Sequence, residues 1–162
     1  MSSLSFHNKR VLLLQGPVGP FFRNLAKDLR GQNAQVFKFN FNAGDWLFYP
    51  THAQSYRGNL TDWPAQLEAF MRAQRIEVVL LFGDCRPVHA CVRGLAQELG
   101  CVVGVFEEGY LRPNYVTFEP VGVNGNSEFV QSLGSWLVEQ ALEGDEEHGG
   151  KAEKSSAEGT PL

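Results

Sequence analysis

Two adjacent carboxylates and an arginine are the residues of this sequence best suited to chemistry. Glu107 and Glu108 are followed by Gly109 and then by Arg112. A carboxylate can act as an acid, a base or a nucleophile, and a guanidinium can hold a carboxylate or a phosphate at two points. The apolar run Cys101–Phe106 just before them predicts a buried strand. We therefore expect these residues in a loop at a strand's carboxyl end, where open α/β sheets bind ligands.

The two carboxylates cannot both serve one cleft if the chain is extended, because adjacent side chains then point to opposite sides. We choose Glu108 as the one that faces the cleft, since it precedes the permissive Gly109. The alternative is that both are solvated or pair with Arg112. Tyr110 could stack on a sugar ring or pack over the sheet edge.

A second candidate loop follows the apolar run Glu77–Phe82. Its Asp84 can contact a ligand or cap the helix that Pro87 would begin. Arg86 can hold an anion or pair with Asp84. His89 lies one turn into that helix and is a candidate for binding or catalysis, although a lone helical histidine is more often structural or solvated.

Two further loops complete the predicted edge. Gly16 and Gly19 precede a predicted helix, whose N-terminus can bind an anion; the alternative is a tight turn. Asp45 lies in a long loop, from Asn42 to about Leu60, that is rich in aromatic and basic residues. That loop is either a cleft wall for carbohydrate or lipid, or a local core. Its other notable residues are Trp46, Tyr49, His52, Tyr56 and Arg57.

Strand and helix patterns alternate along the chain with short connections. This order favours a Rossmann-like three-layer α/β/α sandwich with a mainly parallel sheet, for which we expect the strand order 2-1-3-4. All four loops then converge at one edge. The strands are predicted at Val11–Gln15, Ala34–Phe41, Glu77–Phe82 and Cys101–Phe106, and the helices at Phe21–Arg30, from Thr61 or Asp62 past Met71, and at Pro87–Leu99.

The remaining residues and the composition limit the possible functions. We expect an α/β domain over 1–126, a helix over 127–142 and a disordered acidic tail over 143–162. The net charge of −4 argues against a nucleic-acid partner. No run is long enough to span a membrane and no signal peptide is evident, so we expect a cytoplasmic protein. Three cysteines without CxxC spacing predict neither a disulfide framework nor a metal site. Cys85 could be a reactive thiol, whereas Cys91 and Cys101 fit buried positions.

The sequence contains four motifs that can be compared with known families, namely Gln15–Phe22, Phe39–Asp45, Phe82–Pro87 and Glu107–Pro113. Together they resemble one family, the capsule polysaccharide biosynthesis and export proteins of Gram-negative bacteria. The resemblance covers about residues 10–126 and implies a retaining β-Kdo transferase, with CMP-Kdo as donor, a phosphatidylglycerol-type lipid as acceptor and no cofactor. It also implies one Rossmann-like half of a GT-B-like fold.

Matched by position, the family's acidic loop corresponds to Glu107, Glu108, Gly109 and Arg112, and its Gly-Asp loop to Asp84 and Arg86. The resemblance implies catalytic carboxylates among Glu107, Glu108 and Asp84, and contacts in a capsule assembly complex at the inner membrane. The family's His-Pro motif is missing from this sequence. We therefore expect the acceptor-side half of a transferase; the alternative is a non-catalytic binding or scaffold module.

Overall fold

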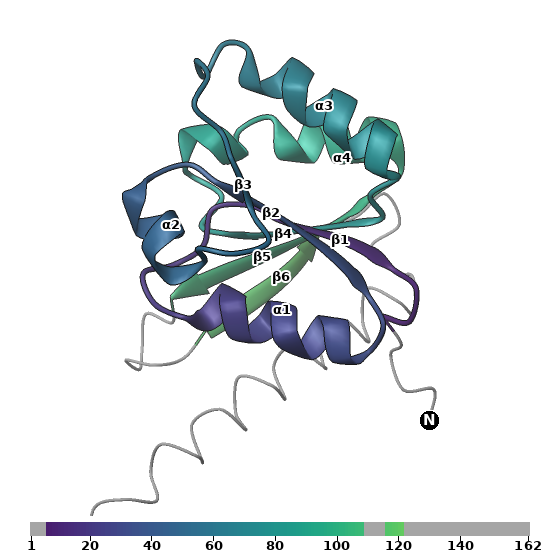
Figure 1. Cartoon of the computed structure of the whole chain (residues 1–162). Coiled ribbons are helices and arrows are strands. Elements are labelled where there is room, and N and C mark those ends of the chain that lie inside the picture. Colours follow the sequence, from purple (N-terminus) through teal and green to yellow (C-terminus); the bar gives the residue numbers. More distant parts are fainter. Residues whose placement is uncertain (1–5, 109–115, 122–162) are drawn as a thin grey trace, which may run out of the picture.

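The computed structural model describes residues 6–108 and 116–121 (Figure 1). Within these ranges the chain forms one six-stranded sheet with helices on both faces. The strands are β1 (Arg10–Leu13), β2 (Gln35–Asn40), β3 (Gln54–Ser55), β4 (Val78–Phe82), β5 (Val102–Glu108) and β6 (Val116–Val121). The helices are α1 (Phe21–Gly31), α2 (Ala43–Phe48), α3 (Trp63–Gln74), the 3₁₀ turn η1 (Pro87–His89) and α4 (Val92–Leu99).

The sheet confirms the predicted fold class and strand order. Its order is β3-β2-β1-β4-β5-β6, and the four predicted strands are β1, β2, β4 and β5, which lie in the predicted order 2-1-3-4. All pairings from β3 through β5 are parallel, whereas β6 runs antiparallel to β5. The carboxyl ends of the parallel strands therefore share one edge.

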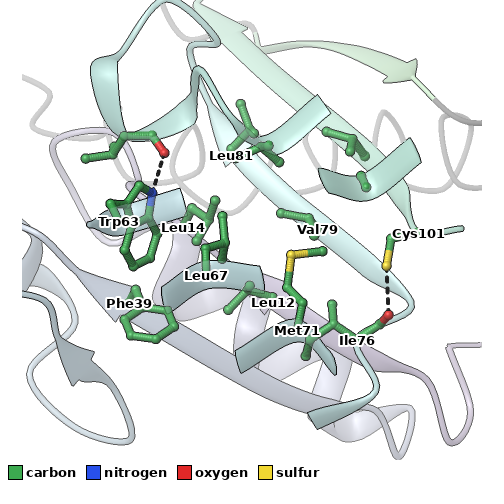
Figure 2. Packing of buried hydrophobic residues seen from close by; sticks show 14 of the residues in the cluster. Leu12, Leu14, Phe39, Trp63, Leu67, Met71, Ile76, Val79, Leu81 and Cys101 are labelled. Carbon is green, nitrogen blue, oxygen red and sulfur yellow. Dashed lines mark hydrogen bonds between the residues drawn. The ribbon is translucent and has the colours of Figure 1, made fainter. Parts of the chain in front are cut away.

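Two apolar cores cover the two faces of the sheet, because successive strand residues point to opposite sides. Leu12 and Val79 pack beneath α3 and α4, and Leu13 and Leu80 pack against α1. Figure 2 shows the core beneath α3 and α4, where the Trp63 Nε1–H donates to the Val88 carbonyl at 2.8 Å. This bond ties α3 to η1. The helix residues in the two cores are Trp63, Leu67, Met71, Val92 and Ala96 on one face, and Phe22, Leu25, Ala26 and Leu29 on the other.

The predicted loop from Asn42 to about Leu60 was wrong in part. The structure places α2 and β3 inside it. Asn42 begins α2, because its side chain accepts a hydrogen bond from the Asp45 N–H at 2.9 Å. β3 extends the sheet by pairing Gln54 and Ser55 with the end of β2.

The predicted helix Pro87–Leu99 is divided. Its start is a 3₁₀ turn, in which the His89 N–H donates to the Arg86 carbonyl and the Ala90 N–H to that of Pro87. These bonds span three residues rather than four, so the chain is wound more tightly there than in an α-helix. The α-helix begins only at Val92.

The predicted position of the two carboxylates must also be corrected. Glu107 and Glu108 belong to β5 rather than to a loop beyond it, and they pair with Thr117 and Val116 of β6. β6 was not predicted. Its Pro120 lies in the outer strand of the described sheet, a position in which proline is tolerated.

The expected helix over 127–142 and the expected tail over 143–162 lie outside the described residues. Within the described part of the chain, no helix is both long and apolar enough to cross a membrane.

Candidate functional site

Gly16 is the point at which three of the four predicted loops meet. Its N–H donates to Oδ1 of Asp45 at 3.3 Å, and its carbonyl accepts from Nη1 of Arg86 at 2.9 Å. Asp45 comes from α2 and Arg86 from the turn after β4. The fourth segment joins through the Gly83 N–H, which donates to the Phe106 carbonyl at 2.8 Å. The predicted convergence at the carboxyl edge is therefore confirmed for these three loops, whereas most of the fourth, Glu107–Pro113, lies outside the described residues.

Asp45 is buried and fully engaged with the backbone around it. Besides Gly16 on Oδ1, its Oδ2 accepts from the Phe41 N–H at 3.0 Å. Only 7% of the residue is exposed. Two backbone donors stabilise the ionised carboxylate in a place where an unpaired charge would be costly.

Lys38 lies beside Asp45 and was missed by the sequence analysis. Its Nζ is 3.8 Å from Asp45 Oδ1, contacts the Phe39 carbonyl, and lies 5.8 Å from the centre of the Tyr49 ring. Burial lowers the pKa of Lys38 to about 8, although the Asp45 carboxylate acts to raise it. The sequence did carry a signal for the burial of Lys38. This lysine stands between two phenylalanines in a predicted parallel strand, and such strands are covered on both faces.

His89 is neutral and buried at the same edge. Its Nδ1 donates to the Gly83 carbonyl, so Nε2 is an acceptor. Nε2 finds no hydrogen-bond partner among the described residues, and the residue is 2% exposed. Burial lowers the pKa of His89 to about 4; the hydrogen bond to Gly83 opposes this effect and the nearby Arg86 cation adds to it.

Asn40 is a second buried polar residue that the sequence analysis did not select. Its Nδ2 donates to the Tyr49 carbonyl at 2.8 Å, while its Oδ1 has no partner among the described residues. Tyr49 is itself buried, and its hydroxyl accepts from Arg30 at 3.0 Å. Tyr56 is also buried and packs on Trp63. Both tyrosines of this segment therefore serve local packing, whereas Trp46 remains exposed.

Asp84 neither caps the following turn nor pairs with Arg86 in the described structure. Its Oδ2 instead forms an ion pair with Arg93 Nη2 at 2.8 Å, and its Oδ1 accepts from the Cys85 thiol. The hydrogen bond to Asp84 and the charges of Asp84 and Glu107 raise the pKa of Cys85. These contacts argue against Cys85 as a reactive thiolate, because only a lowered pKa favours that form. Cys101 is buried, as expected, whereas Cys91, which was also expected to be buried, is only half-buried.

The remaining predicted residues are placed only in part. Gly19 has a φ of +118°, a conformation that favours glycine. Glu107 is half-buried, and for Glu108 the structure describes the backbone alone. Gly109, Tyr110 and Arg112 lie outside the described residues.

The edge thus combines two kinds of group. A buried network of Lys38, Asp45 and Gly16 fixes the backbone, while the half-buried Asp84 and Glu107 carboxylates lie closer to solvent. Groups of the second kind can exchange protons with a bound molecule. Groups of the first kind can only hold the surrounding chain in place.

The chain is similar to proteins of capsule synthesis. Residues 77–156 match the family model described as "Capsule polysaccharide biosynthesis protein". The capsule polysaccharide modification protein LipB of Neisseria meningitidis serogroup A / serotype 4A is 43% identical over 122 residues, which are 74% of this chain and 29% of that protein. The capsule polysaccharide export protein KpsS of Escherichia coli is 40% identical over 121 residues, 74% of this chain and 31% of that protein. This chain thus spans less than a third of the length of these curated relatives.

One solved structure extends over most of the chain at low similarity. The PbgP3 protein from Burkholderia pseudomallei aligns with 88% of this chain and 56% of its own, at a TM-score of 0.42 and 14% sequence identity. This likeness is too weak to support an argument about function.

Proposed function

Because the chain belongs to the family of capsule polysaccharide biosynthesis proteins, we propose that it acts in the assembly of a capsular polysaccharide. The single observation that supports this most directly is the match itself, which runs through three quarters of the chain at 40–43% identity. Three of the four motifs, those that contain Gly16, Asp45 and Arg86, meet at one sheet edge.

More specifically, we propose a role in transferring Kdo from CMP-Kdo to a phosphatidylglycerol-type lipid, with this chain forming the acceptor side. Glu108 is the proposed catalytic carboxylate, assisted by Glu107 and Asp84. The location of Glu107 and Glu108 at the carboxyl end of β5 supports this role, because ligands of open α/β sheets bind at that edge. The Gly83 N–H donates to the Phe106 carbonyl at 2.8 Å, so the end of β5 lies near the Asp84 turn.

A transfer assay tests the proposal. The purified chain is incubated with CMP-Kdo and dihexanoyl-phosphatidylglycerol, and Kdo-lipid is measured by mass spectrometry. If the wild type forms product, Glu108→Gln should lower the rate by at least about a hundredfold, in line with the removal of a general acid or base. Glu98→Gln is the matched control, since Glu98 is an exposed glutamate on α4. Equal rates for wild type and Glu108→Gln would exclude the catalytic role of Glu108.

A second assay keeps the broader proposal testable if the chain transfers nothing by itself. The gene is deleted in its own organism and restored as wild type, Glu108→Gln or Glu98→Gln. Lipid-linked capsule glycan should return with wild type and Glu98→Gln but not with Glu108→Gln. Normal capsule in the deletion strain would refute a role in capsule assembly.

The exposed apolar residues of α2 favour a second candidate function, a non-catalytic module that binds another capsule protein. Trp46 is 58% exposed and Leu47 is 64% exposed, and exposed apolar clusters often mark binding surfaces. The variant Trp46→Ser/Leu47→Ser should then lose co-purification with capsule synthesis or export proteins, while Leu60→Ser, at another exposed leucine, should keep it. Restoration of capsule by the α2 variant but not by Glu108→Gln would argue against this function.

A further inference from the structure

We infer that Asp45 and Arg86 are positioning residues that clamp the Gly16 backbone from both sides, and that they act on a ligand only through the loop that Gly16 begins. The inference refines the proposed function, on which its ligand-binding part rests, because both charged residues were expected to contact substrate directly. The two hydrogen bonds to Gly16 are present in the ligand-free chain and do not depend on the proposed function.

Two hydrogen bonds hold the Gly16 backbone. Asp45 holds the N–H at 3.3 Å and Arg86 holds the carbonyl at 2.9 Å. The two side chains come from different segments, 29 and 70 residues away along the chain. A backbone unit that is held at both its donor and its acceptor has little freedom to shift, so the residues that follow it leave β1 in one direction.

Gly16 is also closely packed against Phe22. A Cβ at this position would lie 2.9 Å from Cδ2 of Phe22. The Phe22 ring is buried and packs edge-on against Phe106, with ring centres 6.0 Å apart. Gly16 therefore lies between the two charged side chains and the aromatic core under α1. The two hydrogen bonds and the contact with Phe22 together leave the Gly16 backbone little room to move.

Asp45 has little capacity left for a ligand. Its two oxygens accept from Gly16 and Phe41, and the Lys38 ammonium lies 3.8 Å from Oδ1. The Asp45 side chain is 4% exposed. A substrate at the sheet edge would have to break these contacts before it could reach the carboxylate.

Arg86 and Arg93 have different partners. The Asp84 carboxylate, which was a candidate partner for Arg86, is held by Arg93 at 2.8 Å. Arg86 reaches across the edge to Gly16 instead. Arg93 thus orders the Asp84 carboxylate after β4, and Arg86 orders the loop after β1.

The loop held in this way is suited to contact a bound molecule. Val18 is 90% exposed, and Gly19 has a positive φ that permits a sharp change of direction before α1. The segment 17–20 contains no charged residue. Its backbone shape is therefore what a ligand would recognise, and the clamp determines that shape.

Amide hydrogen exchange in the ligand-free chain, followed by NMR, tests the clamp. Asp45→Ala and Arg86→Gln should each speed exchange of the Gly16 amide by about fivefold or more, the factor expected from losing one net hydrogen bond. Exchange of the Leu14 amide, which donates to the Leu80 carbonyl in the sheet, should stay unchanged. Arg93→Gln is the matched control and should leave Gly16 as it is. Arg86 is only half-buried, so its variant tests the clamp even if Asp45→Ala does not fold.

Titration of the same variants with dihexanoyl-phosphatidylglycerol and with CMP-Kdo tests the link to binding. We expect Arg86→Gln to weaken binding of the probe that the wild type binds, and Arg86→Lys, which can still donate to the Gly16 carbonyl, to recover part of it. Weaker binding by Arg86→Gln with unchanged Gly16 exchange would overturn the inference, because Arg86 would then contact the ligand itself. Altered Gly16 exchange in a chain that binds neither probe would support the clamp and count against the proposed function.

Discussion

At the residue scale, the buried pair of Lys38 and Asp45 is the central electrostatic feature of the carboxyl edge. Its atoms are 3.8 Å apart and both side chains are nearly inaccessible. Removing one partner of such a pair leaves a buried charge without compensation, which is more damaging than removing both.

We predict that Asp45→Asn lowers the free energy of unfolding by about 3 kcal/mol at pH 7, because Lys38 loses its counter-charge. Adding Lys38→Met should recover a large part of this loss. Urea denaturation of the two single variants and the double variant measures the coupling. The exposed ion pair of Glu68 and Arg72 provides the control, and Glu68→Gln should cost no more than about 0.5 kcal/mol. Additive effects of the two buried substitutions would show that the pair is not coupled.

His89 leads to a prediction about pH. Its pKa is lowered from 6.5 to about 4 in the folded chain, so between these values the unfolded chain binds a proton that the folded chain does not. Stability from this residue is therefore complete above pH 6.5 and is lost as the pH falls toward 4. The total effect is on the order of 3 kcal/mol.

Thermal unfolding of wild type and His89→Gln between pH 4 and pH 7.5 checks this expectation. The wild type should lose stability more steeply than His89→Gln below pH 6.5, although carboxylates contribute to both curves. His52→Gln removes an exposed histidine and should follow the wild type. Parallel curves for wild type and His89→Gln would contradict the buried neutral state.

At the scale of the elements, the junction of β1 and α1 depends on a glycine for reasons of space. We predict that Gly16→Ala destabilises the fold by about 1–3 kcal/mol, since the new methyl group would collide with Phe22. Gly94→Ala in α4 is the opposite case, with no atom within 4 Å of the added carbon, and should stabilise the helix by up to about 1 kcal/mol. Chemical denaturation measures both. An unchanged free energy of unfolding in Gly16→Ala would mean that the Phe22 ring moves aside readily.

The sequence predicted the main elements well and their ends less well. Strong apolar runs such as Val78–Phe82 can hardly be anything but buried strands. Short elements carry weaker signals: α2 depends on the Asn42 cap, β3 has two residues, and β6 has a proline. β3 and β6 exist because β2 and β5 offer free edges, and a free edge is a property of the assembled sheet.

At the scale of the whole molecule, the proposed acceptor role predicts which ligand stabilises the chain. A ligand that binds the folded state raises its stability by about 2.7 kcal/mol at a hundred times its dissociation constant. Dihexanoyl-phosphatidylglycerol should therefore raise the melting temperature by several degrees, and CMP-Kdo alone by much less. Dihexanoyl-phosphatidylcholine is the lipid control. A larger shift with CMP-Kdo would assign the chain to the donor side instead.

The sequence by itself determined the α/β class and the family, because hydrophobic periodicity and contiguous motifs are local properties. The order of the four main strands was a prediction that the assembled sheet confirmed, since local periodicity does not specify which strands pair. It also determined which loops would share an edge, since parallel strands all end on the same side. The tertiary structure decided how the charges on that edge are used. Arg86 holds Gly16 rather than Asp84, Asp84 is held by Arg93, and Lys38 is buried beside Asp45. These partners are distant in sequence, and the choice among them depends on distances and burial that exist only once the sheet has formed.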